Sequence, residues 1–137
     1  WADTHSPAEV RELLEQNPSF GFLKPEPFAP VRGASGVPLI AKASVASDRS
    51  LIPAGTTLLA EVPELNAKGK FTGKYHMRLM VALDVGGAIK GQHFDMYQGI
   101  GPDAGHSAGF YNHYGRVWVL KSAQNGKPLF TAYAPSN

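Results

Sequence analysis

Residues 79–120 read LMVALDVGGAIKGQHFDMYQGIGPDAGHSAGFYNHYGRVWVL. The run at 79–83 is apolar without a break, and it predicts a strand that is buried on both faces and ends at Asp84. Three glycines then follow at close spacing, Gly86, Gly87 and Gly91. Because glycine has no Cβ, they indicate a backbone with positive φ or the close passage of another segment. The stretch thus predicts a buried strand that leads into a tightly turning loop.

Further short strands are predicted on both sides of this loop. Their expected ranges are 39–45, 56–62, 75–83 and 116–121, with turns at 48–50 and 52–55 and a polar hairpin tip at 66–70. Short strands at this spacing, with glycine-rich connections and little helix, indicate a small closed β-barrel. The residues therefore predict a mainly β fold.

One helix is predicted at the N-terminus. Residues 6–9 have the Ser-Pro-x-Glu pattern of a helix start with a capping box, and the apolar residues that follow recur with helical spacing until Pro18. Residues 18–38 are rich in Pro and Gly and predict a connector, with a short strand at 21–24. We expect residues 122–137 to form a tail with one edge strand.

Composition limits the classes of function. The 137 residues are 43% apolar, enough for one core of ordinary size, so we expect one main domain. The net charge of +2 is spread along the chain without a basic block, which argues against nucleic acid as a partner. Cysteine is absent, and His93, His106 and His113 lack the spacing of a metal site. We therefore expect no metal and no cofactor.

Three aspartates are candidates for acid–base chemistry. Asp48 lies in a predicted turn, where aspartate commonly accepts hydrogen bonds from its own backbone, so a structural role is expected. Asp84 ends the apolar strand, and the residues leave open whether it holds the adjacent loop or lines a site. Asp95 stands between Phe94 and Met96, where burial would keep its proton near neutral pH. Asp95 is therefore the stronger candidate for a catalytic acid.

The region that carries these aspartates resembles a known enzyme family. The pattern DxGGAIKGxxxDxYxG, followed by GPxAGHxAG and YGRVWVL, is similar to the C-terminal catalytic part of the membrane-bound lytic murein transglycosylase A family. Asp48, Asp84 and Asp95 match the members of its three-aspartate domain. The resemblance runs from the first helix to about Lys121, and it implies a six-stranded double-psi β-barrel with an N-terminal helix and connector.

The resemblance implies a lytic transglycosylase. Such an enzyme cleaves the β-1,4 bond between N-acetylmuramic acid and N-acetylglucosamine of peptidoglycan without water and leaves a 1,6-anhydromuramoyl product. Asp95 matches the single catalytic acid, and Asp84 would support it. One acid suffices because the C6 hydroxyl of the muramic sugar is the nucleophile, so one group donates a proton and later accepts another. We expect Asp95 to be partly buried, with Asp84 close enough to hydrogen-bond its loop or to disfavour its ionisation.

Residues near Asp95 supply candidates for glycan binding. Polar side chains lie close to it in sequence, and aromatic rings pack on the C–H faces of sugars. The aromatic set is Tyr97, Phe110, Tyr111, His113, Tyr114 and Trp118, and most of it is expected in the core, Trp118 above all. The expected binding residues are Lys90, Gln92, Tyr97, Gln98 and Tyr111.

The resemblance also implies an organisation and a location. Residues 1–26 would be a helix and connector from a preceding domain, and residues 27–137 the catalytic barrel. We expect a fragment of a periplasmic protein held at the outer membrane by a lipidated N-terminus that this chain lacks. The expected partners are peptidoglycan glycan strands, the missing N-terminal part and other cell-wall enzymes. Two alternatives are a glycan-binding barrel without turnover and an interaction module with an exposed apolar patch.

Overall fold

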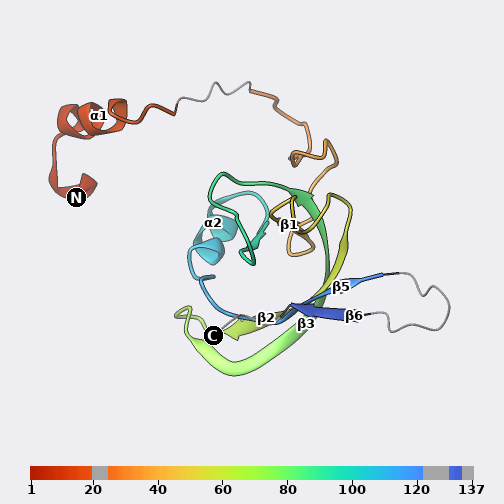
Figure 1. The fold of residues 1–137 in the computed structure, drawn as a ribbon. Coiled ribbons are helices and arrows are strands. Elements are labelled where there is room, and N and C mark those ends of the chain that lie inside the picture. Colours follow the sequence, from red (N-terminus) through yellow and green to blue (C-terminus); the bar gives the residue numbers. More distant parts are fainter. Residues whose placement is uncertain (20–24, 122–129, 134–137) are drawn as a thin grey trace.

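A six-stranded sheet forms the body of the chain (Figure 1). The computed structural model describes residues 1–19, 25–121 and 130–133. The strands are β1 (Ser44–Ala46), β2 (Thr57–Leu65), β3 (Phe71–Asp84), β4 (Asp95–Met96), β5 (Val117–Leu120) and β6 (Phe130–Tyr133). Their order across the sheet is β4-β1-β3-β2-β5-β6, so the strands that begin and end the sheet come from distant parts of the sequence.

The sheet is mixed and open. Strand β1 runs parallel to β3 and antiparallel to β4, whereas the β2–β3, β2–β5 and β5–β6 pairs are antiparallel. Figure 1 shows the sheet strongly curled, but among the described residues no pairing joins its edge strands β4 and β6. The predicted mainly β class is confirmed, whereas a closed six-stranded barrel is not, because closure requires each edge strand to find a partner.

The longest pairing is the β2–β3 hairpin. Its tip is held by Asn66, whose side-chain oxygen accepts hydrogen bonds from the backbone N–H groups of Lys68 and Lys70 at 2.9 and 3.0 Å. Gly69 has a φ angle of +71°, which a residue with a Cβ rarely adopts. The hairpin predicted with its tip at residues 66–70 is therefore confirmed.

The core lies on one face of the sheet. Its buried residues alternate along the central strands, as the period of two in a strand requires, and they are Val45, Ile52, Leu58, Ala60, Val62, Met80, Ala82 and Val119. Burial of residues 79–83 on both faces of the strand was expected and is wrong. Leu79 is 63% exposed, and Val81 and Leu83 are half-buried, so that only Met80 and Ala82 of this run are fully buried.

Several boundaries differ from the sequence expectations. The strand expected at 39–45 begins only at Ser44, because a turn with Lys42 at a φ angle of +61° precedes it. The edge strand expected in the tail is present as β6, paired with β5. Trp118 is half-buried and lies outside the core, since its neighbour Val119 points inward instead. The strand expected at 21–24 lies outside the described residues.

Helices are few and lie away from the core. The chain begins with a 3-10 turn, η1 (Ala2–Thr4), and α1 (Pro7–Glu15) follows. The predicted capping box of α1 is present, with the Ser6 N–H donating to the Glu9 carboxylate at 2.8 Å. Helix α2 (Pro102–Ala108) was not predicted. Within residues 1–19, 25–121 and 130–133, no helix has the length and apolar character needed to cross a membrane.

Candidate active site

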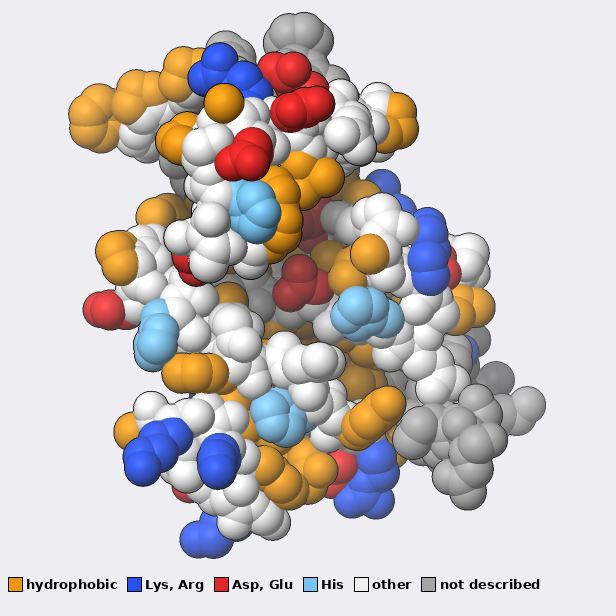
Figure 2. Space-filling view, turned by 90° about the vertical axis from the view of Figure 1, so that its left-hand side faces the viewer, with side chains coloured by type: hydrophobic (Ala, Val, Ile, Leu, Met, Phe, Trp, Pro, Cys, Tyr) orange, Lys and Arg blue, Asp and Glu red, His pale blue; other side chains and the backbone are white. Residues whose placement is uncertain are grey.

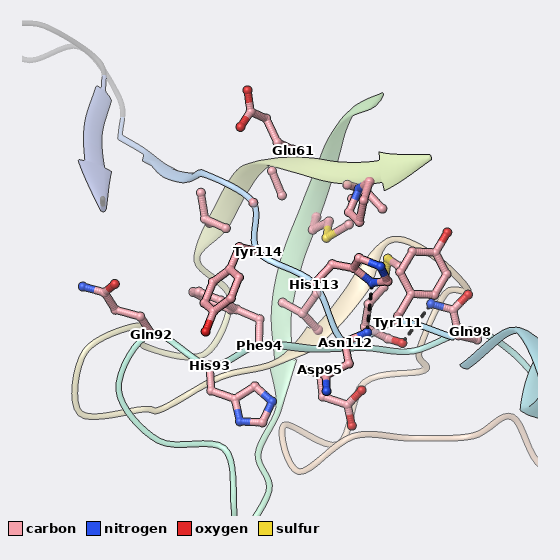
Figure 3. Close-up of a pocket in the computed structure, with 18 of the residues that line it drawn as sticks. Glu61, Gln92, His93, Phe94, Asp95, Gln98, Tyr111, Asn112, His113 and Tyr114 are labelled. Atoms are coloured by element: carbon pink, nitrogen blue, oxygen red, sulfur yellow. Dashed lines mark hydrogen bonds between the residues drawn. The ribbon is translucent and has the colours of Figure 1, made fainter. Parts of the chain in front are cut away.

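An open pocket of about 760 Å³ lies against the inner face of the sheet. The inner residues of β1, β2 and β3 form its floor, and segments 92–98 and 108–115 form its walls. Figure 2 shows the hollow in the middle of one face, with acidic side chains and histidines around it. The lining residues with polar or aromatic side chains are Glu61, Gln92, His93, Phe94, Asp95, Gln98, Tyr111, Asn112, His113 and Tyr114 (Figure 3).

Asp95 lines this pocket from the start of β4. Its partial burial was expected and is wrong, because the side chain is exposed. The alternation of side chains along an extended segment explains the difference: Phe94 and Met96 pack against the core, so the residue between them faces the other way. In Figure 3 the carboxylate and the imidazole of His93 leave their segment on the same side. Asp95 is thus accessible to a molecule in the pocket.

Asp84 lies outside the pocket lining. Its side-chain Oδ1 accepts a hydrogen bond from the backbone N–H of Ala34 at 2.9 Å, which fixes the segment before β1. Ala46 pairs with Asp84 on one side and with Asp95 on the other. The two aspartates are therefore separated by two strand spacings, about 10 Å between backbones. The described side-chain hydrogen bond of Asp84 connects it to that segment and not to the loop that carries Asp95.

Asp48 connects the turn after β1 to the glycine-rich loop. Its Oδ1 accepts hydrogen bonds from the N–H of Ser50 at 3.0 Å and from the Ser50 hydroxyl at 2.7 Å. Its Oδ2 accepts one from the N–H of Gly91 at 2.9 Å, where φ is +62°. The hydrogen bonds from Ser50 and Gly91 lower the pKa of Asp48 to about 2. This carboxylate thereby holds the loop that leads into Asp95.

Acid should release this loop. The pKa of the Asp48 carboxyl is lowered when the chain folds, so its stabilising contribution is complete above the ordinary value of 3.8 and is lost as the pH falls toward about 2. We expect the protection factor of the Gly91 amide, which compares its exchange rate with the intrinsic rate at the same pH, to fall across this interval, as measured by NMR. In Asp48→Ala the Gly91 amide should have little protection at every pH, because alanine offers no side-chain acceptor for this hydrogen bond. Equal protection of the Gly91 amide at pH 5 and pH 2 would show that the Asp48 carboxylate does not hold this loop.

The expected binding residues divide into two groups. Gln92, Gln98 and Tyr111 line the pocket with Asp95, whereas Lys90 and Tyr97 do not. Gln98 is buried, and its amide nitrogen donates to the backbone oxygen of Met96 at 3.3 Å, so its side chain is partly engaged. Tyr111 packs on the core with one side, which leaves its other side available to the pocket.

Two lining residues with polar side chains were missed in the sequence. Glu61 belongs to β2 and Asn112 to the irregular segment 111–115 between α2 and β5, which we call the strap. Glu61 could not be found by local spacing, since its partner Arg116 lies 55 residues away. Asn112 directly follows Tyr111, which was a candidate. Asn112 itself was missed because its position in the pocket wall depends on the path of the strap.

No metal centre is formed by the residues that the structure describes, since they contain no group of three histidine, aspartate or glutamate side chains placed to hold an ion. His93 has its Nδ1 3.3 Å from the backbone oxygen of Ala88, and His113 accepts a hydrogen bond at Nδ1 from the Asn112 N–H at 3.2 Å. Both rings line the pocket beside Asp95 without converging on a common point. The arrangement can supply acid–base chemistry and hydrogen bonds to a polar ligand.

A model of one protein family, described as 3D domain, matches residues 43–121, more than half of the chain. The chain belongs to the 3D domain family. The matched part of this 3D domain contains Asp48, Asp84 and Asp95 together with the strap, so the family assignment covers the whole pocket.

Two relatives of this 3D domain have the same name. Membrane-bound lytic murein transglycosylase A of Escherichia coli K12 is 74% identical over 131 residues, which are 96% of this chain and 36% of that protein. Its Vibrio cholerae counterpart is 56% identical over 120 residues, or 88% of this chain and 33% of that protein. The resemblance inferred from the sequence is confirmed. The chain spans about a third of the length of these relatives.

Solved structures agree with this assignment. The crystal structure of E. coli MltA with bound chitohexaose matches this 3D domain with a TM-score of 0.81 and 76% identity, over 90% of this chain and 37% of that one. MltA from Neisseria gonorrhoeae matches with a TM-score of 0.62 at 34% identity, over 82% of this chain and 28% of that one. In both solved structures the region that matches this chain is part of a longer chain.

Proposed function

We propose that the protein to which this chain belongs is a lytic transglycosylase of peptidoglycan. It cleaves the β-1,4 bond between N-acetylmuramic acid and N-acetylglucosamine and leaves a 1,6-anhydromuramoyl end. The observation that carries the proposal is the accessible carboxyl group of Asp95 in the wall of a pocket of about 760 Å³. The relatives named lytic murein transglycosylase support the choice of substrate.

Asp95 acts first as an acid and then as a base in this proposal. It gives its proton to the glycosidic oxygen as the bond to the anomeric carbon breaks. The C6 hydroxyl of the same muramic sugar then attacks that carbon and returns its proton to Asp95. Because the nucleophile belongs to the substrate, no second carboxylate is needed to activate water, which is why one acid serves where ordinary glycosidases use two.

Asp95 must be protonated to begin this cycle. We infer that the remainder of the protein and the glycan itself cover Asp95 during turnover, since burial disfavours the charged form. The exposed carboxyl group of the isolated chain supports the view that this chain is an incomplete catalyst. Asp84 supports the site through Ala34 and β1 rather than through direct contact with Asp95.

Glycan binding is assigned to the residues that share the pocket with Asp95. Gln92 and Tyr111 are the proposed direct contacts, an amide for sugar hydroxyls and an aromatic ring for a sugar face. Gln98 is proposed to hold the wall while its remaining hydrogen-bonding capacity faces the pocket. Lys90 and Tyr97 lie outside the lining, so we propose that they contact only the outer parts of a long glycan.

The remaining assignments concern the whole protein. We propose that residues 1–26 belong to a preceding domain and that residues 27–137 form part of a double-psi β-barrel closed by strands from the rest of the protein. The whole protein is proposed to act in the periplasm, anchored at the outer membrane through a lipidated N-terminus. The exposed apolar side chains on the uncovered face of β3 support contact with that missing part or with other cell-wall enzymes.

The test is digestion of purified peptidoglycan by the whole protein, followed by mass spectrometry of the new glycan ends. Anhydromuramoyl ends are expected, and they are one water lighter than reducing ends. Reducing ends would overturn the proposal in favour of hydrolysis. Retained glycan binding without any cleavage would favour the second candidate, a binding module without turnover, which the exposure of Asp95 supports for this chain alone.

A further inference from the structure

Glu61 and Arg116 form a two-pronged ion pair at the rim of the pocket. The Arg116 Nε donates to Glu61 Oε2 at 2.9 Å, and its Nη2 donates to Oε1 at 2.6 Å. The backbones add two more hydrogen bonds, from Glu61 N–H to the Arg116 oxygen at 2.8 Å and from Arg116 N–H to Glu61 Oε2 at 3.2 Å. Such paired, charge-assisted bonds fix direction as well as distance.

Neighbouring side chains further restrict the position of the Arg116 guanidinium. The Glu61 side chain is 12% exposed, so it is largely shielded from water, whereas Arg116 is 64% exposed. The guanidinium also lies 5.3 Å from the centre of the Trp118 ring, and it is thus held between a carboxylate and an aromatic face. The hydrogen bonds from Arg116 lower the pKa of Glu61, which keeps the carboxylate ionised.

The ion pair stands where the strap leaves the sheet. A Cβ on Gly115 would lie 2.2 Å from the backbone oxygen of Glu61, so the strap passes directly over β2 at this point. Among the described residues, the backbone groups of 112–115 form no hydrogen bond to another segment. Apart from the ring of His113, 6.4 Å from that of Phe71, the path of the strap depends on its two ends. The ion pair fixes one of them.

We infer that Glu61 and Arg116 are positioning residues that hold the strap as one wall of the pocket and thereby set the affinity for glycan. The inference rests on the proposed function. Residues 111–115 all line the pocket, as does the segment that carries Asp95. Figure 3 shows the Glu61 carboxylate turned away from Asp95, so this carboxylate does not reach the reacting atoms. A loose wall must be ordered by the ligand, which weakens binding more than it slows the chemical step.

The experiment uses the whole protein and three variants. Glu61→Gln removes the charge, Arg116→Lys keeps the charge but loses the two-pronged geometry, and Glu64→Gln is the matched control. Glu64 belongs to the same strand and lies 3.4 Å from His76, outside the pocket lining. The measurements are the Kd for chitohexaose by calorimetry, kcat and KM for peptidoglycan cleavage, and hydrogen exchange across the strap.

We expect Glu61→Gln and Arg116→Lys each to raise Kd and KM about fivefold, with kcat changed less than about twofold. Amides of the strap should exchange faster in both variants, and Glu64→Gln should match the wild type throughout. Unchanged Kd and KM in both variants, or a lower kcat at unchanged KM, would overturn the inference while leaving the proposed function intact. A wild-type protein that neither binds nor cleaves glycan would overturn the proposed function and, with it, this inference.

Discussion

Asp95→Asn is expected to slow peptidoglycan cleavage by the whole protein by about a hundredfold to ten-thousandfold, the range that general acid–base catalysis contributes. Asparagine keeps the size of the side chain but has no proton that it can give to a glycosidic oxygen and recover. Because Asp95 is exposed and belongs to a short edge strand, the substitution should leave the fold and the glycan Kd nearly unchanged. Release of anhydromuramoyl fragments, followed by mass spectrometry, measures the effect.

Two further aspartates serve as controls for this substitution. Asp103→Asn changes an exposed residue in the first turn of α2, outside the pocket, and should retain full activity. Asp84→Asn keeps a carboxamide oxygen that can accept the hydrogen bond from Ala34, so a smaller loss is expected than at Asp95. Cleavage by Asp95→Asn at more than a tenth of the wild-type rate would show that another group supplies the proton.

Leu58→Ala should lower the free energy of unfolding of this chain by about 3 kcal/mol, as typical for a fully buried leucine. Leu58 is 1% exposed and lies in the middle of the core, between β3 and β5. Leu79→Ala is the matched control, because the side chain is 63% exposed on the other face of the hairpin. It should lower the free energy by less than about 0.5 kcal/mol. Urea unfolding followed by circular dichroism measures both.

Similar losses for the two leucine variants would mean that the uncovered face of β3 is shielded in solution. Leu79 would then be in contact with another segment or another copy, contrary to its exposure in the structure. A small loss for Leu58→Ala alone would instead indicate that the core around Leu58 adjusts to fill the space that the side chain leaves.

Local signals predicted the fold where the structure depends on local chemistry. The capping box of α1 and the hairpin tip at Asn66 follow from side chains that bond within four residues, and both were predicted. The burial of Leu79 was predicted wrongly. An apolar run shows that a strand is suited to burial, but it does not show whether another segment packs on each face of that strand. Helix α2 was missed, since its glycine and small residues are typical of a loop.

Those parts of the candidate site that lie close together in the sequence were also predicted. Asp95 was selected for its apolar neighbours and its match to the family's catalytic acid, and Gln92 for its proximity to Asp95. The structure places both in the pocket wall. The exposure of Asp95 was missed, because its apolar neighbours suggested burial, whereas side-chain alternation turns it away from them. Glu61 was missed altogether, since only the β2–β5 pairing brings it to Arg116. The sequence therefore indicated the candidate acid and its polar neighbours, whereas strand pairing between distant residues determined the walls of the pocket.

The uncovered face of β3 determines how the isolated chain should behave in concentrated samples. Tyr75, Met77 and Leu79 are exposed in a row on this face, with Phe71 at its far end. Two copies that stack these rows against each other remove apolar surface from water, so we expect the sedimentation coefficient to rise with protein concentration. Met77→Lys should suppress this rise by placing a charge in the middle of the row. Spectroscopy on the chain alone is therefore best performed at high dilution.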